Sequence, residues 1–296
     1  MEFIKIWEKA SWPEEVSIIA LEVLSTLVER KIKLVDDVTI WVCDRVVGNK
    51  KISNRLRTSG CDYLFSLADF NAKQLASRES LLKKIVETVC LTCAEPYKHR
   101  EDDEETGEFV QEIALWLIET LAITIKPKKI YPVLFEAAVN LIKSEDTNQI
   151  NTGFLVLGAI CEGCAEKVKK NLQNPIMNVL IPRGLAHSAP EVKGAAINAL
   201  CYFSEHLIPD IFEYHGVIIP ALLGHISDLS LKVASKALIA IDVFFDGMEQ
   251  EDIIQYLAPA VPRLIEVLGN NNSTPLMKAA AISAIGSSVY VAEHQF

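Results

Sequence analysis

The sequence is poor in residues that interrupt regular structure, with 13 glycines and 12 prolines among 296 residues. Half of the residues are hydrophobic, which excludes a disordered, collagen-like or linker-dominated chain. Long apolar runs are also lacking, because the longest uncharged one, Gly153–Cys161, is well short of the ~20 residues that a membrane helix requires. Residues 1–11 contain no secretory hydrophobic region. We therefore expect a folded chain without a membrane segment.

Positive charge is scarce as well. Lys and Arg number 29 against 39 Asp and Glu, which gives a net charge of −10 at pH 7. Such a chain repels phosphate backbones and anionic lipids, so we expect no direct nucleic-acid or membrane partner and favour a basic protein. The 7 cysteines are an odd number scattered through apolar helical runs, which predicts free thiols in a reducing compartment.

Motifs of catalysis and cofactor binding are missing too. The pairs Cys90/Cys93 and Cys161/Cys164 are about seventy residues apart and lie inside predicted helices, which favours buried apolar side chains over a zinc site. The 6 histidines form no metal-spaced pair, and no nucleophile elbow, phosphate loop or paired-carboxylate pocket is visible. The sequence therefore predicts no enzyme, no cofactor and no metal site.

Apolar residues recur at helical spacing almost everywhere, as at Ile18, Leu21, Leu24 and Val28. Sustained polar–apolar alternation and βαβ patterns do not occur. Two markers then repeat along the chain. The first marker is a proline near the start of a helix, and its copies are 43, 45 and 42 residues apart, at Pro132, Pro175, Pro220 and Pro262. The second marker is an alanine followed by an aliphatic residue late in the next helix, and its copies are 40, 41 and 44 residues apart, at Ala159, Ala199, Ala240 and Ala284. A period of about 42 with two helices per unit predicts an all-α fold, a right-handed α-α superhelix built as a HEAT-repeat solenoid.

These markers divide the chain into about seven helix pairs in a single array. The expected helices are 1–8 and 14–30, 34–48 and 51–69, 79–95 and 109–125, 128–143 and 147–166, 168–187 and 190–207, 211–226 and 229–246, and 250–269 and 274–292. The corresponding repeats are 1–30, 34–69, 79–125, 128–166, 168–207, 211–246 and 250–292. Solenoids need polar capping repeats, so a chain that opens and closes on apolar helices is expected to be an internal fragment of a longer array.

The sharpest charge feature is an acidic loop at 97–108, inside the third repeat. Its acidic core comprises Glu101, Asp102, Asp103, Glu104 and Glu105. Such a run is either a solvated loop or a flexible arm for a basic ligand, and the sequence leaves both open.

We call the two members of each helix pair its first and second helix. The second helices carry polar and aromatic residues on the side opposite their apolar stripe. In the fifth repeat the packed stripe of Ala196, Ala199 and Phe203 turns Asn198, Tyr202 and Glu205 outward together. The same construction predicts further outward positions at Glu112, Trp116, Glu119, Asn151, Glu162, Ser235, Asp242 and Asp246. Because an aromatic ring among carboxylates can hold a lysine or arginine, these positions are candidate binding residues for basic cargo.

Three segments resemble importin-beta-type nuclear transport receptors, within the branch of importin 4 and its fungal karyopherin counterpart. They are Gly153–Cys164 with its Glu-Gly-Cys ending, Asn198–Leu207 with its Phe-Ser-Glu step, and Glu119–Ala122 followed by Lys126-Pro127. The similarity is collinear from about Pro13 to the C-terminus.

The resemblance implies a non-catalytic receptor that shuttles between cytoplasm and nucleus and releases cargo on binding Ran-GTP. It implies histones and ribosomal proteins as cargo on the second helices, and phenylalanine-glycine repeats of nucleoporins on the first helices. The family's acidic insertion falls where residues 101–108 lie, which implies a role for them toward Ran or cargo. The rival interpretations are a HEAT scaffold subunit of a phosphatase or adaptor complex, and a helical regulatory subunit of a catalytic partner.

Overall fold

The computed structural model describes residues 5–7, 12–30, 36–96 and 109–291, and the side chains of these up to residue 289. Every regular element in these ranges is helical, which confirms the predicted all-α class. The chain divides into two compact units, Met1–Lys167 and Val168–Phe296. None of the described helices combines the length and the hydrophobicity of a bilayer-spanning segment.

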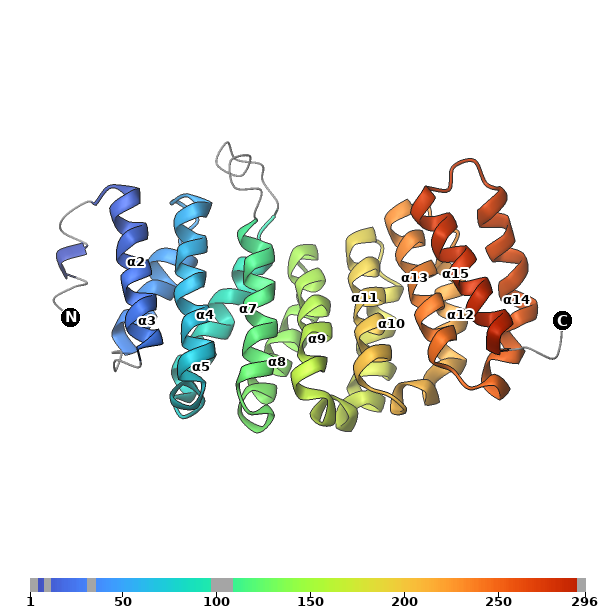
Figure 1. Cartoon of the computed structure of the whole chain (residues 1–296), viewed down its shortest axis with the longest axis horizontal. Coiled ribbons are helices and arrows are strands. Elements are labelled where there is room, and N and C mark those ends of the chain that lie inside the picture. The colour runs from blue at the N-terminus through green and yellow to red at the C-terminus, as the bar shows by residue number, and fades with distance from the viewer. Residues whose placement is uncertain (1–4, 8–11, 31–35, 97–108, 292–296) are drawn as a thin grey trace. The chain divides into compact units, whose positions relative to one another are not determined.

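The first unit contains paired helices (Figure 1). In its first helices, α3 continues into a π-helical segment at Val42–Val47. Its second helices run beside one another. The bounds are α2 (Glu14–Glu29), α3 (Asp36–Trp41), α4 (Asn54–Ala76), α5 (Glu79–Cys93), α7 (Val110–Thr124), α8 (Pro127–Ile142) and α9 (Thr147–Val168).

The second unit repeats the arrangement. The first helix of its first pair is a composite of three segments, Lys169–Asn171, Leu172–Leu180 and α10 (Ile181–Leu185). In the next pair, a short 3-10 helix at Asp210–Tyr214 leads into α12 (His215–His225). The first helix of the last pair is α14 (Gln250–Gly269). Its second helices are α11 (Pro190–His206), α13 (Leu231–Gly247) and α15 (Pro275–Val291).

Second helices pack side by side within each unit, α2 on α4 and α4 on α7 in the first, and α11 on α13 and α13 on α15 in the second. First helices pack on the first helices of the next pair, as α5 does on α8 and α12 on α14. The predicted helical stripe of α2 is buried, since Leu21 and Val28 have no exposed surface. Within the units, α4 and α13 therefore each pack against two second helices and a first helix, and their remaining side is open.

The small residues late in the second helices lie where helices meet. Ala159 is 3% exposed, and Ala199, Ala240 and Ala284 are completely buried. A small side chain at a helix contact allows the backbones to approach closely. The repeat marker found in the sequence therefore reflects the packing between neighbouring helices.

Two predicted helices differ most from the structure. The one predicted at 168–187 is interrupted at Asn174, whose backbone angles (φ −133°, ψ 127°) are not helical. The one predicted at 51–69 is α4, which begins at Asn54. Instead of ending at residue 69, α4 runs to Ala76 and is kinked at Asn71, whose backbone angles (φ −123°, ψ 19°) are not helical. Leu75 beyond the kink is buried, so the extra turns are held by core packing that the local sequence does not show. The kinked residue Asn71 lines a groove at this end of α4.

Candidate protein-binding faces

The open side of α7 brings together three predicted residues, Glu112, Trp116 and Glu119. They recur at four and three residues, opposite the buried Ile113, Leu117 and Leu121. Glu112 is exposed, Trp116 is 51% exposed and Glu119 is half-buried. An exposed indole between two carboxylates can hold a cation over its ring while the acids neutralise the charge.

The open side of α4 carries two acids that the sequence analysis missed, Asp62 and Asp69. They are seven residues apart, on the face opposite the buried Leu64 and Leu67, and both are exposed. Their seven-residue spacing, which places both on one side of a helix, is the signal in the sequence that could have found them. Because α4 packs beside α7, the acidic face of the first unit extends over both helices.

On α9 the structure places Asn151 half-buried and Glu162 exposed, eleven residues apart on one face. The Glu-Gly-Cys segment is explained by its neighbours. A Cβ on Gly163 would lie 2.0 Å from the carbonyl oxygen of Ala122 in α7, so only glycine fits there. The next residue, Cys164, is buried, and its thiol donates to the same Ala122 carbonyl oxygen at 3.9 Å.

In the second unit, α11 presents the predicted trio. Asn198 and Tyr202 are half-buried and Glu205 is exposed. The ring of Tyr202 stacks on His206 with centroids 6.3 Å apart, and Glu205 Oε2 lies 3.9 Å from His206 Nε2. The ring of Tyr202 is thus held by His206 of the same helix, and the carboxylate of Glu205 lies beside that histidine.

The open side of α13 differs from those of α7 and α11, because it carries lysines as well as acids. Asp242 is half-buried and accepts a hydrogen bond from Ser287 Oγ of α15 at 3.1 Å, while Asp246 is exposed and Ser235 is half-buried. The helix also carries two lysines, the exposed Lys232 and Lys236, which is exposed as well but whose amine reaches back to α11. The ammonium of Lys236 donates to the Gly194 carbonyl oxygen of α11 at 3.3 Å, and burial lowers its pKa. The predicted acids of α13 therefore share their helix with two cations.

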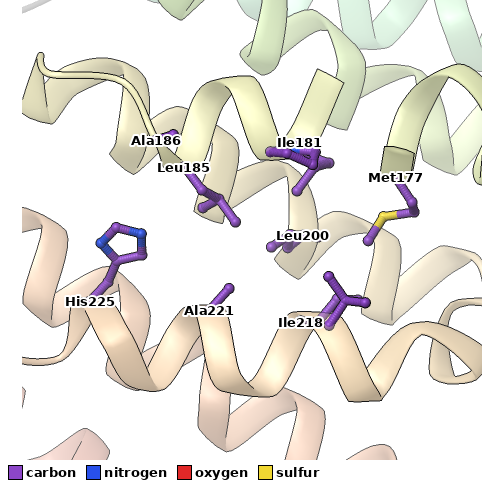
Figure 2. A pocket seen from close by; sticks show the side chains of 10 residues that line it. Met177, Ile181, Leu185, Ala186, Leu200, Ile218, Ala221 and His225 are labelled. Carbon is purple, nitrogen blue, oxygen red and sulfur yellow. The ribbon is translucent and has the colours of Figure 1, made fainter. Parts of the chain in front are cut away.

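An apolar groove lies among the first helices of the second unit (Figure 2). Its volume is about 290 Å³. Ile181 and Leu185 of α10 face Ile218 and Ala221 of α12, with Met177 at one end and His225 at the other. Its width and lining suit one aromatic or aliphatic side chain of a partner.

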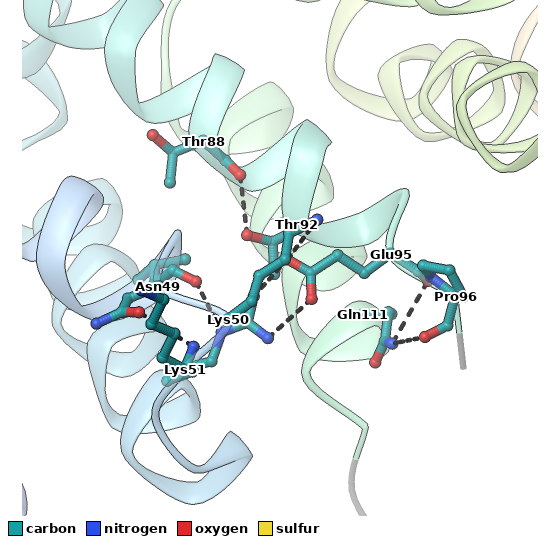
Figure 3. Close-up of polar contacts among 10 residues, drawn as sticks. Asn49, Lys50, Lys51, Thr88, Thr92, Glu95, Pro96 and Gln111 are labelled. Carbon is teal, nitrogen blue, oxygen red and sulfur yellow. Dashed lines mark hydrogen bonds and ion pairs between the residues drawn. The ribbon is translucent and has the colours of Figure 1, made fainter. Parts of the chain in front are cut away.

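The acidic core Glu101–Glu105 and the rest of the predicted loop at 97–108 lie outside the described residues. The chain just before the loop is fixed by a polar network (Figure 3). Arg57, which is 1% exposed, donates through both terminal nitrogens to Glu95 at 2.8 and 2.6 Å. Gln111 donates to the carbonyl oxygens of Glu95 and Pro96. The last residues before the loop are therefore held at one position on the first unit.

The cysteines of the two Cys-x-x-Cys pairs are buried, free thiols. Burial raises the pKa of all four, to about 11 for Cys93 and Cys164. Across the described residues, no group of three or more His, Cys, Asp or Glu side chains could hold a metal ion. Neutral buried thiols act as small apolar groups.

Comparison with known proteins gives one consistent result, although no family model matches the chain. The chain is 25% identical over 257 residues to the probable importin subunit beta-4 of Schizosaccharomyces pombe, covering 87% of this chain and 23% of the relative. It is 26% identical over 228 residues to importin-4 of Homo sapiens, covering 72% of this chain and 21% of the relative. The chain thus spans about a quarter of the length of these curated relatives.

Solved structures of the karyopherin Kap121p share the fold. The complex with Pho4p matches with a TM-score of 0.86 at 20% identity over 99% of this chain and 29% of that chain. The complex with RanGTP matches with a TM-score of 0.83 at 20% identity, over 95% of this chain and 29% of that chain. The complex with Nup53p matches with a TM-score of 0.86 at 19% identity, over 99% of this chain and 29% of that chain. The HEAT-repeat solenoid and the resemblance to importin-beta-type receptors are confirmed.

Proposed function

We propose that this chain is a segment of a nuclear import receptor whose second helices bind lysine-rich segments of cargo. The observation that carries the proposal is the similarity to importins in sequence, together with carboxylates and aromatic rings on the open sides of α7 and α11. Histones and ribosomal proteins are the basic cargo that this chemistry fits. Such a receptor works in cytoplasm and nucleus and has no catalytic step of its own.

Affinity in this proposal comes from many weak contacts. An exposed ion pair contributes only ~0–1 kcal/mol, so a basic tail must engage several acids and rings along its length. The net charge of −10 steers such a tail toward the chain. We expect binding of a histone-tail peptide to be micromolar or weaker and to fall steeply with added salt.

The test is fluorescence anisotropy with a labelled histone-tail peptide. The variant Trp116→Ala/Tyr202→Ala/Glu205→Ala should bind more weakly than a control that removes two aromatic rings and one acid from first-helix positions, Phe135→Ala/Glu136→Ala/Tyr214→Ala. Equal losses for the two variants, or no binding to the unmodified chain at low salt, would contradict the cargo role of the second helices.

Two further partners belong to the proposal, because structures of Kap121p are known with RanGTP and with Nup53p. Binding of Ran-GTP would release the cargo, and the acidic residues 101–105 are the candidate segment for contact with Ran or cargo. For nucleoporins, the apolar groove between α10 and α12 is the candidate site for the phenylalanine of a phenylalanine-glycine repeat.

The nucleoporin site is tested by filling the groove. Ala221→Phe places a ring in it and should abolish the chemical-shift changes that a phenylalanine-glycine peptide causes. Ala258→Phe makes the same substitution at an exposed position of α14 and should leave them unchanged. If Ala221→Phe binds the peptide like the unmodified chain, the groove is not the nucleoporin site.

A further inference from the structure

A second kind of groove lies in the first unit, at the C-terminal ends of α4 and α7. Its volume is about 990 Å³, and its lining includes Asp69, Phe70, Asn71, Lys73, Lys126 and Lys129. It owes its shape to the kink of α4 at Asn71 and to the tight turn between α7, which ends at Thr124, and α8, which begins at Pro127. Asp69 is the one residue that this groove shares with the acidic face of α4, and the groove is distinct from the proposed nucleoporin site.

The charge of this groove is opposite to that of the chain. Lys73, Lys126 and Lys129 are exposed and form no ion pair with any of the described residues. Asp69 is the one carboxylate among the residues that line the groove. At neutral pH lysines are cationic, so the lining carries a net positive charge on a chain whose total is −10.

Asn71 supplies an independent observation. It is only 9% exposed and lines the groove, and its side chain forms no hydrogen bond with another described residue. The amide is therefore available to pair with a ligand in the groove. The amide both donates and accepts. A peptide group offers the matching acceptor and donor, whereas a phosphate dianion offers acceptors only and would leave the Oδ1 atom of Asn71 unpaired.

We propose that this groove binds an extended acidic segment of a partner protein. The side chain of Asn71 pairs with a peptide group of the segment, and its Asp or Glu side chains lie against Lys73, Lys126 and Lys129. Phe70, which is 47% exposed, offers an apolar surface for one side chain of the segment. The proposal does not depend on the import function, because it rests on a different groove and the opposite charge.

The test uses the full chain and a fluorescein-labelled peptide of Asp and Glu residues around one phenylalanine. A peptide with Asn and Gln in their place is the matched probe, and it should not bind. Lys126→Gln/Lys129→Gln should weaken binding of the acidic peptide about fivefold to thirtyfold, since it removes two ion pairs of ~0.5–1 kcal/mol each. Lys170→Gln/Lys232→Gln removes the same charge elsewhere and should change the affinity less than about twofold.

Asn71→Leu separates a ligand-binding role from a structural one. It removes the amide at similar volume, so it should weaken peptide binding while leaving the melting temperature unchanged or higher. A clearly lowered melting temperature would mean that the amide serves the fold, and it would overturn the proposal. So would equal losses in the two lysine variants, or displacement of the acidic peptide by an equal concentration of inorganic phosphate, which would indicate a general anion site.

Discussion

Gly163 shows how one residue sets the spacing of two second helices. The carbonyl oxygen of Ala122 occupies the place where its Cβ would be, at 2.0 Å. A backbone atom cannot swing aside, so Gly163→Ala must separate α9 from α7. We expect a loss of about 1–3 kcal/mol in the free energy of unfolding, as overpacking usually costs. Chemical denaturation checks this, and a variant as stable as the parent would show that the contact is looser in solution.

Ala199 makes the corresponding point in the second unit. It is fully buried in α11, whereas its neighbour Asn198 is half-buried on the open side. Ala199→Phe should therefore cost about 1–3 kcal/mol and Asn198→Ala within about 0.5 kcal/mol. Denaturant melts of the two variants should rank them in this order. The reverse order would mean that the helix faces are assigned with the wrong rotation.

At the scale of elements, an ion pair links the turn before α13 to the preceding second helix. Asp228 accepts a hydrogen bond from Lys193 Nζ of α11 at 2.7 Å and from the backbone amide of Ser230 at 2.9 Å. Both side chains are largely buried. Lys193 lies near the start of α11 and Asp228 just before α13, so the ion pair joins one helix pair to the next.

This link should make stability depend on pH. Burial raises the pKa of Asp228, but the hydrogen bonds from Lys193 and Ser230 outweigh it and leave the pKa below the usual 3.8. A lowered pKa contributes stability above pH 3.8 that is lost as the pH falls through the folded-state value. The melting temperature of Asp228→Asn should thus lie below that of the parent at neutral pH, and the gap should close in acid. Asp246→Asn, at an exposed position, should show no such change.

Helix positions could be read from the sequence because apolar spacing and breakers are local properties. The predicted bounds of α7, α8, α11 and α14 differ from the structure by at most one residue. The end of α4 could not be read, because Leu75 is held by neighbours rather than by its own sequence context. The grouping of these helices into one array of seven repeats stays a prediction.

The open faces were harder to predict than the helices. Trp116 and Glu205 are exposed as expected, since their helices have clear buried stripes opposite. Asp242 is instead bonded to Ser287, a contact that depends on the exact rotation of α13 against α15. The groove beside Asn71 arises from a kink, which no spacing rule reports. Whether the proposed residues bind cargo stays a prediction.

At the scale of the whole molecule, the acids are spread unevenly over the second helices. The open sides of α4 and α7 carry Asp62, Asp69, Glu112 and Glu119. On α13, Lys232 and Lys236 accompany Asp242 and Asp246 and oppose their field. If the chain binds lysine-rich peptides, the acids of α7 should therefore contribute more than those of α13.

A pair of double variants with the same change in charge tests this. Glu112→Gln/Glu119→Gln should weaken a lysine-rich peptide about threefold to tenfold at low salt, because each exposed ion pair contributes up to ~1 kcal/mol. Asp242→Asn/Asp246→Asn should weaken it less than about twofold, since the nearby lysines already repel the peptide. The difference should fade at ~1 M salt, where the screening length shrinks to ~3 Å. Equal losses, or losses that persist at high salt, would mean that charge on α7 does not select the peptide.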